Sequence, residues 1–258
     1  MENPVVAGVL VALIVPFLGN TLGAALVFLM RHGMSERFTK ALLGFAAGVM
    51  IAASVWSLIT PALEAAEGGP VPAWAPAAVG FLGGMLLLLA IDHFTPHLHV
   101  GSDEPEGPVT TLKKPTMMLF ALAIHNLPEG MVVGLAAALA LRGEPDAVSG
   151  ALALALGIGL QNIPEGAAVS LPLAQEGRSK CRAFAAGAAS GLVEPLGGLL
   201  ALALAGWVSA ALPWLMSLAA GCMVCVTAQE MIPEAVEQDE PAGVISVVLG
   251  FALMMALD

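Results

Sequence analysis

Two related six-residue segments contain the side chains best suited to chemistry in this chain. HNLPEG occupies residues 125–130, and QNIPEG at residues 161–166 repeats its pattern thirty-six residues further along. Both lie inside long apolar runs, where a charged side chain at the centre of a membrane-spanning helix costs roughly 2.5–3.5 kcal/mol. Two carboxylates in matching apolar contexts need a compensating partner, and a bound cation is the simplest one.

The spacing within each segment suits a metal site on a helix. His125 and Glu129 lie four residues apart and project from one helix face, with Asn126 beside them. The second segment repeats this geometry with Gln161, Asn162 and Glu165. One imidazole with several carboxylate and amide oxygens at one depth suits a borderline to hard divalent ion such as Zn, Fe, Mn or Cd.

A third carboxylate strengthens this interpretation. Glu194, which precedes Pro195, lies in the middle of another apolar run and is the natural third contributor. Considered alone, His125 fits a buried core histidine, and Glu194 alone fits a hydrogen-bonded packing residue. Two matching segments and a third carboxylate at the same depth favour a metal site instead.

The composition is that of an integral membrane protein. Of 258 residues 58% are hydrophobic and only 11% are charged, and the mean hydropathy is +0.89. Soluble domains carry about 25% charged residues. Nine Lys and Arg cannot form a nucleic-acid surface, and three cysteines imply no disulfide framework. We expect a single transmembrane domain over residues 1–258.

Apolar runs of about 20 residues are long enough to cross the hydrocarbon core as helices. The sequence contains eight such runs, at residues 5–30, 41–63, 74–94, 116–141, 147–174, 183–207, 210–232 and 241–257. If they alternate, eight of the nine basic residues fall in loops on one side, and only Arg142 falls on the other. Basic loops stay in the cytoplasm, so we expect both termini on the opposite face.

Several of these motifs resemble a known family. The paired HNLPEG and QNIPEG are similar to the fourth and fifth helices of the ZIP (Zrt/Irt-like) divalent-metal transporters. GLVEP at residues 191–195 and GFAAGVMIAASVWSL at residues 44–58 also resemble this family, in particular its prokaryotic GufA-like branch. The resemblance covers nearly all of the chain.

The resemblance implies an all-α bundle of eight transmembrane helices, with inverted repeats flanking the two metal-binding helices. It implies one metal held by His125, Glu129, Gln161 and Glu165. It implies a second metal held by Asn126, Asn162 and Glu194, with Glu129 and Glu165 bridging. Some relatives have aspartate where this chain has Asn162, so the second metal is expected to bind less tightly here.

Further side chains are expected along the route of the metal. The resemblance places Met50 and Ser57 on this route, and Gln229 and Glu230 at a secondary or exit site. Polar residues at the inner end of the third span and in the following loop are expected to receive the departing metal, namely Asp92, His93, His97 and His99. The further role of the loop at residues 96–114 is left open.

The preferred function is transport of divalent cations, zinc first and Cd²⁺, Fe²⁺ or Mn²⁺ as alternatives, into the cytoplasm of a bacterial cell across its inner membrane. A channel is one alternative, although tight chelation disfavours rapid permeation. An intramembrane zinc-dependent hydrolase is the other, but only one of five histidines lies at mid-depth and HExxH is absent. The partners are the cations and the bilayer, nucleic acid is excluded, and a homodimer is left open.

Overall fold

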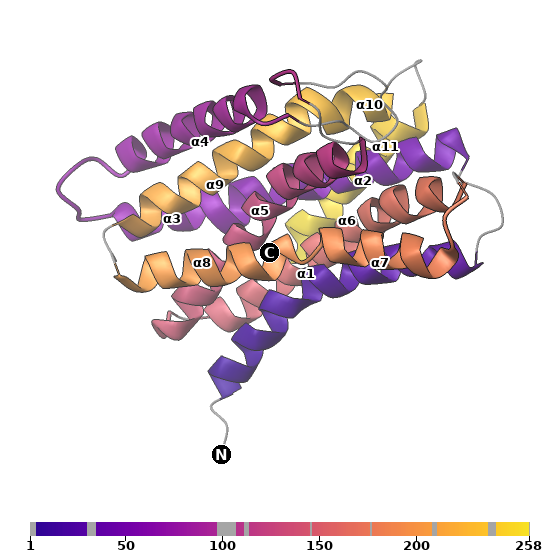
Figure 1. Cartoon of the computed structure of the whole chain (residues 1–258). Coiled ribbons are helices and arrows are strands. Elements are labelled where there is room, and N and C mark those ends of the chain that lie inside the picture. Colours follow the sequence, from indigo (N-terminus) through magenta and orange to yellow (C-terminus); the bar gives the residue numbers. More distant parts are fainter. Residues whose placement is uncertain are drawn as a thin grey trace.

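The computed structural model describes residues 4–29, 35–96, 107–110, 114–144, 146–175, 177–207, 211–236 and 241–257, except for the side chains of residues 114–125, 172, 175, 206 and 207. Across these residues every regular element is helical (Figure 1), as the sequence predicts. Six helical segments are long and apolar enough to cross a membrane, and two shorter apolar helices join them.

The eight predicted spans all correspond to helices of the described chain. Spans one to four are α1 (Pro4–Leu29), then α2 (Glu36–Ala53) with η1 (Ser54–Ile59) and α3 (Thr60–Ala66), then α4 (Trp74–Phe94), and α5 (Lys114–Leu141). Spans five to eight are α6 (Ala147–Gln175), then α7 (Lys180–Ser190) with α8 (Val193–Trp207), then α9 (Leu212–Val226) with η3 (Thr227–Met231) and α10 (Ile232–Val236), and α11 (Pro241–Leu257).

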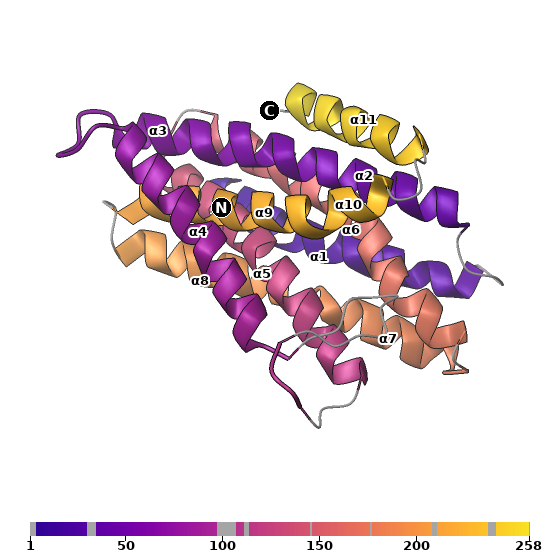
Figure 2. The same ribbon diagram turned by 90° about the horizontal axis from the view of Figure 1, so that it is seen from above.

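The helices pack in four intimate pairs. Helix α1 packs most extensively on α6, and α5 packs on α8; α2 packs on α11, as Figure 2 shows, and α4 packs on α9. This pairing is unchanged when spans one, two and three are exchanged with spans six, seven and eight, and span four with span five. It is the pattern expected of inverted repeats that flank α5 and α6.

Two basic side chains make contacts that are related by the same exchange of repeats. Arg142, just after α5, donates from Nη2 to the carbonyl oxygen of Ala205 near the end of α8 (2.7 Å). Lys180, the first residue of α7 after the connection that follows α6, donates from Nζ to the carbonyl oxygen of Phe28 at the end of α1 (3.3 Å). Cations are favourable at helix C-termini, where carbonyl groups lack intrahelical donors. Each central helix is thus followed by a cation that caps its neighbour.

Spans two and seven each contain a π-helical turn, which the sequence analysis did not predict. Pro61 follows η1 after one residue, and Pro233 follows η3 in the same way. A proline cannot donate to the carbonyl four residues earlier, which here belongs to Ser57 and to Gln229. The wider π turn accommodates this defect, and such turns occur frequently at functional sites.

Span six, expected from the sequence as a single apolar run over residues 183–207, is broken into two helices. Helix α7 ends at Ser190, and α8 begins at Val193 after a turn in which the amide of Glu194 donates to the carbonyl oxygen of Gly191 (3.2 Å). The physical reason is Pro195, which lacks the amide that Gly191 would require and whose ring clashes with that carbonyl in a straight helix.

Candidate metal centre

Six of the seven expected ligands have described side chains, and they lie in three helices. Helix α5 carries Asn126 and Glu129, α6 carries Gln161, Asn162 and Glu165, and the first turn of α8 carries Glu194. All are buried except Glu165, which is partly buried, and both Glu129 and Glu194 are only 1% exposed. His125 lies in α5 directly before Asn126, but its side chain is outside the described residues.

Two hydrogen bonds tie these helices together through the candidate ligands. Gln161 of α6 donates from Nε2 to Oε1 of Glu129 on α5 (2.6 Å). Asn126 of α5 donates from Nδ2 to Oε1 of Glu194 on α8 (3.1 Å). Each carboxylate therefore has one oxygen oriented by an amide. Such bonds hold a ligand in a fixed direction, as outer-shell partners do in metal sites.

The remaining oxygens of this group are buried and have no hydrogen-bond partner among the described residues. They are Oδ1 of Asn126, Oε2 of Glu129, Oε1 of Gln161, Oδ1 of Asn162 and Oε2 of Glu194. A buried polar atom without a partner costs about 1–3 kcal/mol, and a charged one costs more. Five such acceptors on three facing helices suit a hard or borderline cation, because all of them can donate electron pairs to it.

The proximity of the carboxylates also favours a bound cation. Glu129 lies close enough to Glu165 and Glu194 for their charges to interact, and the Asn162 amide lies near both Glu129 and Glu194. Within the described side chains, however, no three His, Cys, Asp or Glu groups cluster tightly enough to hold a metal without other donors. The amides of residues 126, 161 and 162 lie among the carboxylates, so the ligand set is mixed, as the sequence analysis expected.

Glycines of the two motifs allow the helices to approach closely. A Cβ at Gly130 would collide with the backbone of Glu194, and a Cβ at Gly166 would collide with the backbone of Asn20 in α1. Close approach of small residues is the usual means of packing helices in a bilayer. The two contacts are related by the same exchange of repeats, so Asn20 is the counterpart of Glu194.

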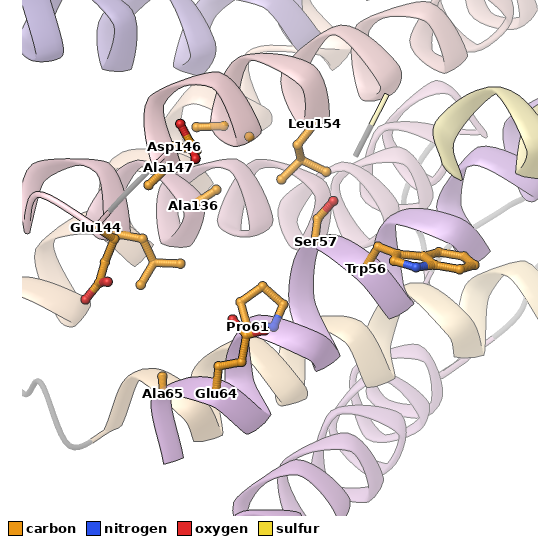
Figure 3. A pocket seen from close by; sticks show the side chains of 13 residues that line it. Trp56, Ser57, Pro61, Glu64, Ala65, Ala136, Glu144, Asp146, Ala147 and Leu154 are labelled. Carbon is orange, nitrogen blue, oxygen red and sulfur yellow. The ribbon is translucent and has the colours of Figure 1, made fainter. Parts of the chain in front are cut away.

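A cavity of about 500 Å³ opens between η1, α3 and the turn that joins α5 to α6 (Figure 3). Ser57 lines this cavity. Glu64 lies on the α3 side, and Glu144 and Asp146 belong to the α5–α6 turn. None of these three acidic residues was predicted from the sequence to be functional. All three lie at or beside short loops that the sequence predicts on the same side of the membrane, and this shared location could have indicated a cluster.

Met50 is fully buried, and its sulfur accepts from Oγ1 of Thr227 in η3 (3.7 Å). It therefore lies where the two π-containing spans meet. Oγ of Ser54 in η1 donates to the Met50 carbonyl oxygen (2.7 Å).

The residues expected at the inner end are only partly brought together. Gln229 lies beside Cys225, with 2.9 Å between Oε1 and Sγ, and both Asp92 and Glu230 lie near enough to that thiol to interact electrostatically. His93 is exposed and packs edge-on against Phe94, at 4.9 Å between ring centroids. The predictions for His97 and His99 lie outside the described residues.

The fold and the centre define a class of protein. A bundle of apolar helices that buries a mixed carboxylate and amide centre at the middle of its spans, and that also contains a cavity lined by three acidic residues, is typical of membrane proteins that bind or transport cations. Intramembrane carboxylates of this kind mark ion routes.

Comparison with known proteins identifies the family. The family model described as "ZIP Zinc transporter" matches residues 113–258. Zinc transporter ZIPB of Bordetella bronchiseptica is 40% identical over 248 residues, which cover 94% of this chain and 77% of that protein. Human zinc transporter ZIP11 is 32% identical, with 92% of each chain covered, and zinc transporter GufA of Myxococcus xanthus is 35% identical, with 79% of each covered.

The chain belongs to the ZIP zinc transporter family, and the likeness to GufA confirms the predicted branch. It is a multi-pass membrane protein of a family that transports divalent metals, and the family is not one of enzymes. The hydrolase alternative is therefore set aside.

Proposed function

We propose that this protein is a carrier that moves zinc across the membrane into the cytoplasm by alternating access to the metal centre. The observation that supports it most strongly is the set of buried oxygens without partners on α5, α6 and α8. A dication cannot enter hydrocarbon with its water shell, so such oxygens must replace that water at mid-depth. The names of the relatives, each a zinc transporter, support zinc as the substrate.

We assign two adjacent ion positions to the centre. One ion is bound by His125, Glu129, Gln161 and Glu165. The other is bound by Asn126, Asn162 and Glu194, with Glu129 and Glu165 shared between the two ions. The hydrogen bonds from Gln161 to Glu129 and from Asn126 to Glu194 support this division, because each amide orients a carboxylate of its own group.

Helix packing supports rigid-body movement of one half of the bundle against the other. Helices α1, α5, α6, α7 and α8 pack extensively among themselves, as do α2, α4, α9 and α11. The two groups meet chiefly through α2 with α6 and through α5 with α9. Since the ligands belong to one group, they can travel together, in the manner of transporters built from repeats.

The route runs from the acidic cavity to the centre and then to the inner end of span seven. Glu64, Glu144 and Asp146 concentrate cations at the outer mouth, and Ser57 and Met50 follow toward the centre. Asp92, Gln229 and Glu230 receive the ion on the cytoplasmic side. In this arrangement residues 1–258 act as one transport domain in a bacterial inner membrane, with both termini extracytoplasmic.

The test is zinc uptake into proteoliposomes that contain a zinc-sensitive dye. The protein is compared with Glu165→Gln, which removes one charge from the centre, and with Glu67→Gln, a matched change at an exposed carboxylate. We expect saturable uptake in the wild type and in Glu67→Gln, and uptake at the level of empty liposomes in Glu165→Gln. Cd²⁺, Fe²⁺ and Mn²⁺ are then added as competitors to rank the ions.

Two outcomes would contradict the proposal. Equal uptake by Glu165→Gln would place the route elsewhere. Flux that rises linearly with zinc concentration, without saturation, would favour a channel over a carrier.

A further inference from the structure

The break in span six presents Glu194 to the metal centre. Because α8 begins at Val193, Glu194 lies in its first turn, beside amide groups that carry the positive end of the helix dipole. A carboxylate is favoured there, and its direction depends on how α8 is set relative to α7. Whatever fixes the geometry of the break therefore fixes the position of this ligand.

Asn20 of α1 holds the other side of the break. Its side chain is fully buried, and Nδ2 donates to the carbonyl oxygen of Gly187 in the last turn of α7 (2.7 Å) and to Oγ of Ser190 (3.4 Å). Ser190 also donates from Oγ to Gly187 (2.7 Å). The last carbonyls of a helix have no intrahelical donors, so these bonds cap α7 within the membrane.

The fit around Asn20 is close on two sides. A Cβ at Gly191, the residue at the break, would fall on the Asn20 side chain, and a Cβ at Gly166 would collide with the Asn20 backbone. Asn20 thus touches the QNIPEG motif through its backbone and the broken span through its amide. It connects the helix of Glu165 with the turn that leads to Glu194.

We infer that Asn20 is a positioning residue for the second ion, acting through the break on Glu194. Asn20 occupies in α1 the position that Glu194 occupies in α8, so the two residues are counterparts under the exchange of repeats. One repeat supplies the ligand Glu194 at this position, and the other repeat supplies the Asn20 amide that orients this ligand. The inference rests on the proposed metal centre.

The test is a double-mutant cycle on purified protein, with zinc stoichiometry and affinity measured by competition with a chromophoric chelator. Asn20→Ala removes the donor without adding charge. We expect it to weaken one of the two zinc ions by 10–100-fold, the usual effect of removing an outer-shell partner, and to leave the other unchanged. In a Glu194→Gln background the same substitution should change affinity less than about threefold, because its target is already altered.

Controls separate this role from a general loss of packing. Thr21→Val, a neighbouring change on α1, should leave both affinities unchanged. Gly191→Ala disturbs the same contact, because its new Cβ falls on the Asn20 side chain, and it should reproduce the selective loss of affinity for one zinc ion. This variant also tests the inference if Asn20→Ala does not fold. Equal weakening in both backgrounds, weakening of both ions alike, or no weakening would overturn the inference. Failure of the wild type to bind zinc would instead contradict the proposed function.

Discussion

Asn162 and Asn126 offer a matched pair of substitutions that tests the ligand assignment. They occupy the same place in the two motifs, and both are fully buried. Asn126 uses Nδ2 to bind Glu194, whereas neither Nδ2 nor Oδ1 of Asn162 has a hydrogen-bond partner among the described residues. Replacement by aspartate therefore breaks the 3.1 Å hydrogen bond at position 126, whereas at position 162 it alters only the weaker polar contacts of that amide with Glu129 and Glu194.

The expected magnitudes follow from this difference. A carboxylate at position 162 adds a like charge near Glu129 and Glu194, and at ~5 Å with an effective dielectric constant of ~20 each pair costs about 3 kcal/mol. When zinc is bound, the new carboxylate attracts the dication. If half of one such charge–charge energy, about 1.4 kcal/mol, is retained as net attraction to the metal, the second zinc binds about tenfold tighter, since 1.4 kcal/mol corresponds to a factor of ten.

Asn126→Asp should gain less affinity. It forfeits a hydrogen bond to a charged group, which contributes about 1.5–3 kcal/mol, and places a carboxylate directly against Glu194. We therefore expect its second zinc to bind at least tenfold more weakly than that of Asn162→Asp. The assay is chelator competition, with thermal unfolding recorded with and without zinc. Without metal Asn162→Asp should melt below the wild type, and with saturating zinc the order should reverse.

The reasoning fails if the two aspartate variants bind the second zinc equally or in the opposite order. It also fails if Asn162→Asp leaves metal affinity unchanged, because the amide would then lie outside the centre.

Three further predictions follow from the packing and from the charges. Gly166→Ala should destabilise the protein by about 1–3 kcal/mol, because its new Cβ meets the Asn20 backbone. Gly150→Ala on the same helix should not destabilise it, because the space around Gly150 is open. Thermal unfolding in detergent measures both. Neutralising Glu64 and Glu144 together should raise the KM for zinc uptake and leave the maximal rate nearly unchanged, with a smaller effect in high salt. Zinc affinity at equilibrium should fall as the pH falls, because protons compete with metal for the carboxylates, and titration with zinc at several pH values checks this.

The eight spans could be predicted because hydropathy reports burial in lipid directly, and the structure places each predicted run in a helix. The motifs predicted which carboxylates and amides would share three helices, since a fixed spacing on a helix gives a fixed face. The break before Val193 was not predicted, although Gly191 and Pro195 were visible. A proline in a membrane helix is compatible with a kink, a π turn or a break, and the choice among these outcomes depends on tertiary packing that the sequence pattern does not contain.

The acidic mouth of the cavity was missed for a different reason. Glu64, Glu144 and Asp146 are far apart in sequence, and acidic residues near helix ends are common on solvated surfaces. Only the approach of α3 to the α5–α6 turn makes them neighbours. Periodicity describes a single helix, so it contains no signal for a cluster contributed by two separate spans.

The repeats explain how one scaffold can combine a rigid centre with movement. Each central helix has its glycine against a flanking helix of the other repeat, Gly130 against Glu194 and Gly166 against Asn20, and each is followed by a cation that caps that same neighbour. These contacts join α1, α5, α6, α7 and α8 into one unit. The π turns lie outside this unit, in spans two and seven, where the second group of helices faces it. In the proposed mechanism, ligand geometry is therefore preserved within one body, while the irregular turns of the other body border the route that opens and closes.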